Sequence, residues 1–318
     1  MRTITQSDIR NLGLSTDAVV KALEHAFHEA AIGEIAWKPK STIGRPDGAF
    51  FIGTLGCWKK RGLGIFHNIM GVSAASVPAG HPHYASVQIV SDYLTGLPLA
   101  CVDGTFTSTV LPVAVTVLAA TRFANPRSAV ATFVGAGAQS RANLEALRTR
   151  FPLQQVRILS RTERSASAFA QEVQAMGLAA KVVTDPKQAL RAADIIVSTV
   201  PSGPALKPFL DPDWVSPGAF VSAVDVGRSW TKGFERFDRL ITDDREQIRV
   251  QYAEGRMPLD LEFDTELAEL VTGTRPPREG AQDRIAFIHP GNLVGVLAIT
   301  ALIYDTIART KGNLDAKP

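Results

Sequence analysis

Cysteine is scarce in this sequence: only Cys57 and Cys101 occur among 318 residues. Their spacing matches no metal-binding motif, so no metal site is expected. Two free thiols in a reducing cytoplasm are the default interpretation, with a single disulfide as the alternative. The chain also lacks an apolar run close to the roughly 20 residues of a membrane span. Its first residues lack the apolar core of a signal peptide. We therefore expect a cytoplasmic protein with no membrane segment.

An excess of charge of one sign is lacking too. The formal net charge is only +3 and the basic residues are scattered, so neither nucleic acid nor a membrane surface is the expected partner. Hydrophobic residues make up 45% of the chain and charged residues 20%, values typical of a globular enzyme. The length suggests about two domains, and a small-molecule substrate is the partner that fits this composition.

The central feature is a short apolar run, residues 129–134, that leads into Gly135-Ala136-Gly137-Ala138-Gln139-Ser140 and then a helix. A parallel strand that turns sharply into a helix directs backbone N–H groups at one point, where they bind a pyrophosphate. Gly135 would allow the tight turn and Gly137 the close approach of a phosphate. The usual third glycine is Ser140 here, so the motif by itself is only moderately specific. The alternative is a glycine-rich turn that binds nothing.

The next expected strand, residues 155–159, ends at Ser160-Arg161-Thr162, where the residue that contacts the adenosine ribose should lie. An acidic residue there would bind the 2′-hydroxyl of NAD, whereas a guanidinium suits a 2′-phosphate. Arg161 therefore favours NADP(H) over NAD(H).

From Ser128 onward, expected strands alternate with expected helices, which predicts a doubly wound parallel sheet. In such a sheet the carboxyl ends of the strands line the ligand crevice, so Thr199, Val200 and Val224 are further candidates for cofactor binding. The expected strands are 129–134, 155–159, 180–184, 194–199, 219–224 and 238–242, and the expected helices are 139–150, 163–176, 186–192 and 244–254.

The first part of the chain has a different pattern. Two helical segments are expected within residues 5–32, followed by strands at 49–54, 62–69, 85–92 and 98–104 that predict a mostly antiparallel sheet. Residues 105–122 are apolar, and we expect a helix that begins near Leu111 with Pro112 in its first turn. A second apolar helix is expected from Leu293 to Ala308.

Several motifs together resemble the ornithine cyclodeaminase/μ-crystallin family, and they cover nearly the whole chain. They are the amphipathic N-terminal helix before Lys38-Pro39-Lys40-Ser41, the hairpin ending Thr95-Gly96-Leu97-Pro98-Leu99-Ala100, the apolar helix before residue 124, Val134-Gly135-Ala136-Gly137-Ala138-Gln139-Ser140, Ser160-Arg161-Thr162, and the segment before the last helix.

The resemblance implies a homodimer in which each chain has two domains. A substrate and dimerisation domain would comprise residues 1–123 and 290–318, and a Rossmann-like NAD(P) domain residues 124–289. It also implies hydride transfer between nicotinamide and a carbon that bears an amine or imine. Lys232 and His83 match family positions near the cofactor.

The sequence departs from the family at the residues that usually hold a substrate carboxylate. The family arginine aligns with Leu111, and no lysine stands within residues 64–68, where the family has one. In the segment Lys38-Pro39-Lys40-Ser41, Lys40 still provides a positive charge. Unlike an arginine, it cannot bind a carboxylate through two parallel hydrogen bonds. Each lost charge-assisted contact is worth roughly 1.5–3 kcal/mol. A substrate without an α-carboxylate, or one held differently, therefore fits better than ornithine.

The candidate catalytic residues are Asp225, His289, His67 and Lys40. The family aspartate falls on Gly227, and Asp225 lies two positions earlier; His289 stands where the family approaches the nicotinamide. His67 follows an apolar strand and could exchange a proton near pH 7. Each has a structural alternative: a hydrogen-bonded histidine, an aspartate paired to Arg228 or Lys232, or a solvated lysine.

Three functions follow from these observations. The first is an NAD(P)H-dependent oxidoreductase acting on a C–N or C=N centre, such as an imine reductase or an amine or amino-acid dehydrogenase. The second is ornithine cyclodeaminase, against which the missing charged residues argue. The third is a non-catalytic, NADPH-dependent binder of a small molecule.

Overall fold

The computed structural model describes residues 1–47, 49–72, 77, 84–201 and 206–310. The chain divides into two units, one formed by residues 1–111 together with 291–318, the other by residues 112–290. The first unit thus contains both ends of the chain. The division falls at 111/112 and 290/291, whereas the family resemblance suggested 123/124 and 289/290.

The terminal unit is built on a mixed sheet. Its spatial order is β1-β7-β6-β5-β4-β2, with β3 also paired to β4. Among the described strands, β1 and β7 pair in parallel and the other pairs are antiparallel, so the expected, mostly antiparallel sheet is confirmed. The strands are β1 (Arg2–Ile4), β2 (Ile35–Trp37), β3 (Ser41–Gly44), β4 (Phe50–Trp58), β5 (Leu63–Gly71), β6 (Tyr84–Asp92) and β7 (Pro98–Asp103).

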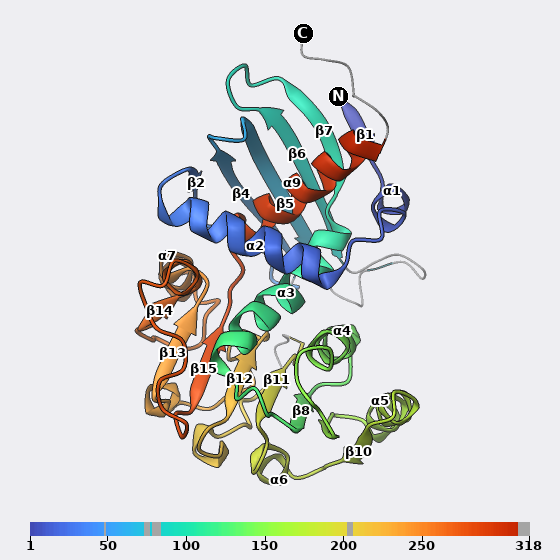
Figure 1. The fold of residues 1–318 in the computed structure, drawn as a ribbon, viewed down its shortest axis with the longest axis vertical. Helices are drawn as coiled ribbons and strands as arrows, with labels where there is room; N and C mark the ends of the chain where they lie inside the picture. The colour runs from blue at the N-terminus through green and yellow to red at the C-terminus, as the bar shows by residue number, and fades with distance from the viewer. Residues whose placement is uncertain (48, 73–76, 78–83, 202–205, 311–318) are drawn as a thin grey trace. The chain divides into compact units, whose positions relative to one another are not determined.

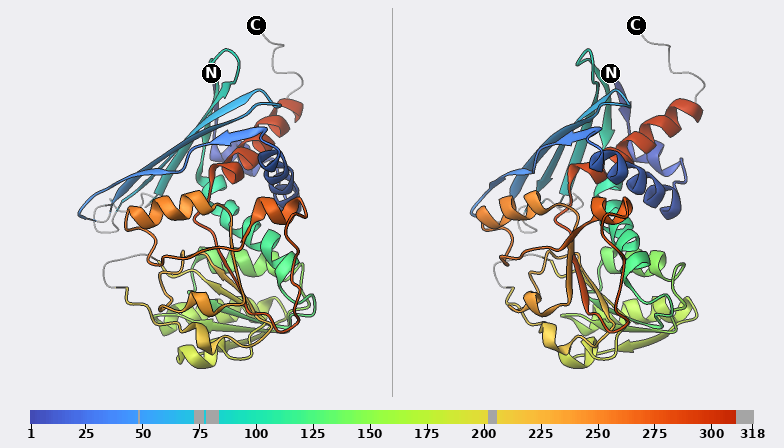
Figure 2. Two further views of the ribbon diagram at one scale, coloured as in Figure 1. Left: turned by 90° about the vertical axis from the view of Figure 1, so that its left-hand side faces the viewer. Right: turned by 60° about the vertical axis from the view of Figure 1, so that its left-hand side comes forward.

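Helices α2 and α9 cover one face of this sheet, as Figures 1 and 2 show. Thr5 caps the first short helix through a capping box with Asp8, and the Ser15 hydroxyl accepts from the Ala18 amide at the start of α2. These caps fix the starts of both helices inside residues 5–32, where two helical segments were expected. The helices of this unit are α1 (Gln6–Arg10), α2 (Thr16–Ala31) and α9 (Leu293–Thr310).

Helix α3 (Thr105–Phe123) begins earlier than the sequence predicted, because Asp103 caps it. The Asp103 carboxylate accepts a hydrogen bond from the Thr105 amide (2.8 Å), and the Gly104 carbonyl accepts from the Ser108 amide (2.9 Å). Pro112 therefore lies inside the helix rather than in its first turn. Helix α3 is also long and apolar enough to cross a membrane, contrary to our expectation of no such run, but 61% of its apolar window is buried within the protein. We regard it as a core helix.

The central unit contains a fully parallel sheet of order β10-β9-β8-β11-β12-β15-β13-β14, which confirms the expected doubly wound α/β fold. The strands are β8 (Val130–Val134), β9 (Gln155–Leu159), β10 (Ala179–Val182), β11 (Ile195–Ser198), β12 (Phe220–Ala223), β13 (Arg239–Thr242), β14 (Thr265–Glu266) and β15 (Ile285–Ile288). The helices are α4 (Ala138–Leu147), α5 (Glu163–Ala175), α6 (Pro186–Leu190), α7 (Arg245–Ala253) and α8 (Leu267–Val271), with 3-10 turns at Pro212–Trp214 and Phe234–Arg236.

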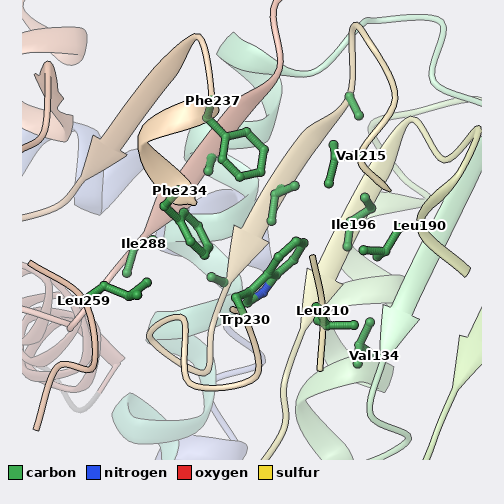
Figure 3. Packing of buried hydrophobic residues seen from close by; sticks show 14 of the residues in the cluster. Val134, Leu190, Ile196, Leu210, Val215, Trp230, Phe234, Phe237, Leu259 and Ile288 are labelled. Atoms are coloured by element: carbon green, nitrogen blue, oxygen red, sulfur yellow. The ribbon is translucent and has the colours of Figure 1, made fainter. Parts of the chain in front are cut away.

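Strand β15 was not predicted, although it lies inside the sheet, between β12 and β13. Its four side chains are all buried, so it has no alternating pattern. In the chain, β15 comes after β13 and β14. In the sheet, however, it lies between β12 and β13. Nearby, Trp230 packs among Leu210, Phe234 and Phe237 in a buried apolar cluster (Figure 3). This cluster supports the loop that follows β12.

Candidate functional site

One row of paired residues crosses the parallel sheet of the central unit and aligns several predicted site residues. Leu159, Val134, Ser198, Ala223 and Ile288 are successive Cα partners on β9, β8, β11, β12 and β15. The next residue of each strand lies at the carboxyl edge of the sheet, where α/β proteins bind ligands. These next residues are Ser160, Gly135, Thr199, Val224 and His289. All five were predicted from the sequence to line the site.

The turn after β8 is fixed by a small network of hydrogen bonds. The Ser140 hydroxyl donates to the Gly135 carbonyl (2.8 Å) and also lies 2.8 Å from the Thr199 hydroxyl. Gly135 has φ +107°, and a Cβ there would stand 2.6 Å from Thr199 Oγ1. Glycine is therefore required at this position by both conformation and space. Ser140 replaces the usual third glycine and ties the turn to β11.

The turn leaves the start of α4 open. Gly137 is the N-cap residue, no side chain caps the helix, and a Cβ on Gly137 would have nothing within 4 Å. Gly137 and Ala138 are exposed, whereas Gln139 is half-buried. The N-terminal amides and the helix dipole make this opening suitable for a phosphate group. The open position of Gly137, beside the strained Gly135, fits the pyrophosphate of a dinucleotide.

Arg141 was not predicted as a site residue, yet it helps to hold this turn. Its Nη1 donates to the Ala136 carbonyl (2.5 Å), while Nε and Nη2 form a two-point contact with Glu172 (2.6 and 2.7 Å). The guanidinium also lies over the Phe169 ring, 4.9 Å from its centroid. Because Glu172 and Phe169 belong to α5, far along the chain, no local sequence signal could reveal this role.

The segment after β9 exposes the predicted ribose contact. Arg161 is exposed, and Thr162 caps α5 by accepting from the Ser165 amide (3.4 Å). Ser160 is half-buried at the edge of the sheet. Arg161 is therefore presented to solvent between a buried strand and a fixed helix start.

The remaining cofactor candidates differ in exposure. Val200 and Val224 are half-buried at the carboxyl edge, while Lys232 is exposed beyond the loop that follows β12. His83 lies outside the described residues. Val224 therefore belongs to the row of residues at the carboxyl edge of the sheet, whereas Lys232 does not.

Asp225 is buried and its two carboxylate oxygens accept hydrogen bonds within the central unit. Oδ1 accepts from the Ser198 hydroxyl (2.9 Å) and the Gly227 amide (3.2 Å), and Oδ2 accepts from the Ser229 hydroxyl (2.5 Å). Trp230 Nε1 donates to the Ser198 hydroxyl (3.0 Å). Burial raises the pKa of Asp225, although hydrogen bonds from the Ser229 and Ser198 hydroxyls act in the opposite direction. The contacts favour a role in positioning the loop between β12 and Trp230.

We expect Asp225→Asn to change how stability depends on pH. Because the folded-state pKa of Asp225 is raised, its contribution to stability is present below its unfolded pKa and is lost as pH rises through its folded pKa. The midpoint of thermal unfolding of the variant, relative to the original protein, should therefore increase between pH 4 and pH 8. Asp225→Ala should instead destabilise the protein at all pH values by roughly 3 kcal/mol, about 1 kcal/mol for each lost hydrogen bond.

The matched control is Asp185→Asn, at an exposed carboxylate that caps α6. Asparagine caps helices about as well as aspartate, so this change should not produce the same trend. A pH-independent difference for Asp225→Asn would show that ionisation of Asp225 does not affect the stability of the fold.

His289 ends β15 and is buried, with 5% of its surface exposed. Its ring stacks on Phe287, with centroids 5.1 Å apart and an interplanar angle of 24°. The stack orients the imidazole at the carboxyl edge of the sheet. His289 is therefore the titratable candidate that shares this edge with Gly135 and Thr199.

The terminal unit contains the other two candidates. His67 on β5 is 2% exposed, and its Nε2 lies 3.0 Å from the Ser86 hydroxyl. Burial, aided by the positive charge of Lys40, lowers the pKa of His67 to about 3. The imidazole is therefore neutral near pH 7 and does not titrate there, so it can bind through hydrogen bonds but is poorly suited to proton exchange.

Lys40 is half-buried between β2 and β3, and its Nζ is 3.0 Å from where a Cβ on Gly291 would be. Leu111, which replaces the family arginine, packs against α9 so closely that a Cβ on Gly295 would lie 2.5 Å from its Cδ1. The apolar side chain thus fills space next to α9. Lys40 supplies a cation beside the start of the same helix.

No group of three or more His, Cys, Asp or Glu residues within the described ranges is arranged to hold a metal ion. Cys57 and Cys101 are both free thiols.

Fold and site together define a two-unit α/β protein whose parallel sheet has a dinucleotide-type turn at its carboxyl edge. The chain belongs to the ornithine cyclodeaminase/mu-crystallin family, whose model matches residues 3–311.

Two relatives and one solved structure illustrate this similarity. The chain is 25% identical over 314 residues to alanine dehydrogenase of Archaeoglobus fulgidus, covering 95% of this chain and 94% of the relative. It is 29% identical over 240 residues to ketimine reductase mu-crystallin of Mus musculus, covering 74% and 72%. The structure of Thermococcus litoralis Δ1-pyrroline-2-carboxylate reductase, in complex with NADH and L-proline, has a TM-score of 0.84 at 22% identity, covering 99% and 100%.

Proposed function

We propose that this protein is an NAD(P)H-dependent oxidoreductase that acts on a C–N or C=N centre, as an imine or ketimine reductase or an amino-acid or amine dehydrogenase. The observation that carries the proposal is the row of edge residues, from Ser160 to His289, around the open start of α4. Relatives named as a ketimine reductase and an alanine dehydrogenase support the reaction class.

The cofactor would supply the hydride, and this chain would bind and orient it. The amides at the start of α4 would hold the pyrophosphate, and Ser140 with Arg141 would keep the turn in shape. Reduction of an imine also consumes one proton. His289 is the proton donor that the proposal favours, because Asp225 is engaged by Ser198, Ser229 and Gly227. Within the terminal unit, Lys40 is the side chain proposed to bind a carbonyl or anionic oxygen.

We further propose that NADP(H) is preferred, because Arg161 is exposed at the end of β9 and carries a guanidinium where NAD-specific proteins carry an acid. A cytoplasmic location is proposed on the basis of the two free thiols.

The test is NADPH oxidation by the purified protein with cyclic imines, with keto acids plus amines, and with ornithine. Reduction of an imine or of a keto acid with an amine would support the proposal. Release of ammonia and formation of proline from ornithine would favour ornithine cyclodeaminase. NADPH binding without turnover across the panel would favour a non-catalytic binder.

A homodimer through the outer face of the terminal sheet completes the proposal. Leu55, Phe66, Ile89 and Cys101 are successive cross-strand partners on the face opposite α9, and Leu55 and Phe66 are 54% and 48% exposed. A continuous exposed apolar surface of this kind is typical of a protein interface. Because the family resemblance implies a dimer, the proposed occupant is a second copy of this chain.

Phe66→Glu should therefore convert the dimer to a monomer, because it would bury a charge in the proposed apolar interface. Light scattering after size-exclusion chromatography gives the mass. Lys59→Glu, at an exposed position beyond β4, provides a charge-changing control that should remain dimeric. A Phe66→Glu dimer, or a monomeric original protein, would contradict the proposed interface.

A further inference from the structure

The helix-covered face of the terminal sheet changes from apolar to polar within one row. Gly56, Ile65, Val90 and Ala100 form an apolar row across β4 to β7, and the next row consists of Thr54, His67, Gln88 and Val102. We call Thr54, His67 and Gln88 the polar row. Directly opposed residues of antiparallel strands hold their Cβ atoms about 4.5–5.5 Å apart, so these side chains are neighbours.

Gln88 is the unusual member of the polar row. Its side chain is fully buried, at 0% exposure, and neither Oε1 nor Nε2 has a hydrogen-bond partner among the described residues. Burial of a primary amide without partners opposes folding, and an apolar side chain of similar size would avoid that penalty. The amide therefore fits a role in binding.

His67, beside Gln88, shows the same property on one ring nitrogen. Nε2 is engaged with the Ser86 hydroxyl, whereas Nδ1 is buried and has no partner within the described ranges. The Thr54 hydroxyl, by contrast, donates to the Lys38 carbonyl (2.8 Å). Gln88 Oε1, Gln88 Nε2 and His67 Nδ1 thus lack hydrogen-bond partners among the described residues, whereas the Thr54 hydroxyl has one.

We propose that Gln88 and His67 select the substrate, and that they bind a neutral carboxamide group rather than a carboxylate. A carboxamide donates one N–H to Gln88 Oε1 and accepts from Gln88 Nε2 through its carbonyl, so a cyclic pair of hydrogen bonds forms. A carboxylate accepts only, and one of its oxygens would face Oε1 without a proton between them. His67 itself is uncharged, and the proposal assigns the Lys40 ammonium, whose charge acts on His67, to a second oxygen of the substrate.

This inference rests on the proposed function, because it assigns a substrate class to the same enzyme. It explains how the chain could manage without the family's arginine at position 111, where Leu111 packs on α9. An uncharged substrate group is bound through complementary hydrogen bonds, and it does not require an ion pair with an arginine. Lys40 remains suited to a second oxygen of the same substrate.

The test uses binding of L-prolinamide and L-proline, measured by isothermal titration calorimetry with and without NADP⁺. The two probes share the ring and differ in the carboxamide or carboxylate. We expect the original protein to bind L-prolinamide at least ~10-fold more tightly, since one net hydrogen bond to a fully buried group is worth about that factor. Gln88→Leu should remove most of this preference.

Thr54→Val is the matched control, because the Thr54 hydroxyl is already bonded to the chain; this variant should keep the preference. The midpoint of thermal unfolding supplies a second measurement. Gln88→Leu should unfold at the same or a higher temperature than the original protein, because it removes a buried amide that lacks partners. A lower midpoint would mean that the chain itself bonds Gln88, and it would overturn the inference.

Tighter binding of L-proline, no binding of either probe, or a preference that survives Gln88→Leu would also overturn it. The proposed function fails separately: a protein that binds L-prolinamide but oxidises no NADPH with any imine would refute the reductase and leave the binding site. Turnover of carboxylate-bearing imines in preference to their carboxamides would refute the binding site and leave the reductase.

Discussion

Gly137→Asp should weaken NADPH binding by at least ~100-fold without unfolding the protein, because it places a carboxylate where the pyrophosphate would bind. The backbone of Gly137 is extended, with φ −95° and ψ −170°, and a Cβ there meets nothing within 4 Å. Any residue can therefore occupy this position. An aspartate would also cap α4 and interact favourably with its dipole, adding roughly 0.5–1 kcal/mol of stability.

Gly137→Asp should therefore raise the stability of the fold while it lowers the affinity for NADPH. Thermal unfolding measures the first, and titration of NADPH fluorescence measures the second. Gly137→Asn is the matched control, because it has the same shape and capping ability without the charge. It should bind NADPH more tightly than Gly137→Asp, and the difference between the two should shrink at high salt.

Gly135→Ala provides the contrasting case, because that position has φ +107° and a Cβ would clash with Thr199. It should lower both stability and NADPH affinity. If Gly137→Asp bound NADPH within a few-fold of the original protein, the pyrophosphate would not lie at the start of α4, and the cofactor site would have to be sought elsewhere.

The cofactor turn could be predicted from sequence because its determinants are local. The apolar run before Gly135, the glycine spacing and the following helix lie within residues 129–147, and the structure places them as β8 and α4. The caps Thr5, Ser15 and Thr162 are equally local. What the sequence could not reveal is Arg141, whose contacts with Glu172 and Phe169 depend on tertiary packing.

Strand β15 illustrates a second limit. Strand β15 pairs with β12 and β13, which lie far from it along the chain. A search for strands that alternate with helices in sequence order therefore misses it. His289 could be proposed as a site residue only through family resemblance. The strand register explains the location of His289. Because Ile288 pairs with Ala223, His289 lies at the same edge of the sheet as Val224.

Strand β6 illustrates a third limit. A strand was expected over residues 85–92, and because apolar residues usually face the core, Val87 and Ile89 would be expected to point inward. In the structure Gln88 and Val90 face the helices instead, and both are buried. The sequence alone could not distinguish the faces, because the outer face is apolar as well. The same inversion brings Gln88 into the interior and supports an interface on the outer face.

Arg161→Asp should reverse the choice between NADPH and NADH. The guanidinium is exposed at the end of β9, next to Thr162, which caps α5. Loss of one or more charge-assisted hydrogen bonds to a 2′-phosphate costs roughly 1.5–3 kcal/mol each, which corresponds to about 10–150-fold in NADPH affinity. The new carboxylate would repel the phosphate but could accept a hydrogen bond from the 2′-hydroxyl of NADH.

The measurement is the ratio of the dissociation constants for NADPH and NADH, since a general loss of structure would change both. Arg164→Ala tests the neighbouring exposed arginine, and it should lower NADPH affinity less than Arg161→Asp. Arg127→Ala is the matched control, because Arg127 precedes β8 and therefore lies toward the amino edge of the parallel sheet, away from Gly135. An unchanged ratio in Arg161→Asp would contradict the NADP(H) preference while leaving the pyrophosphate site at Gly137 intact, because the two contacts involve different groups of the cofactor, the 2′-phosphate and the 5′-pyrophosphate of the adenosine ribose.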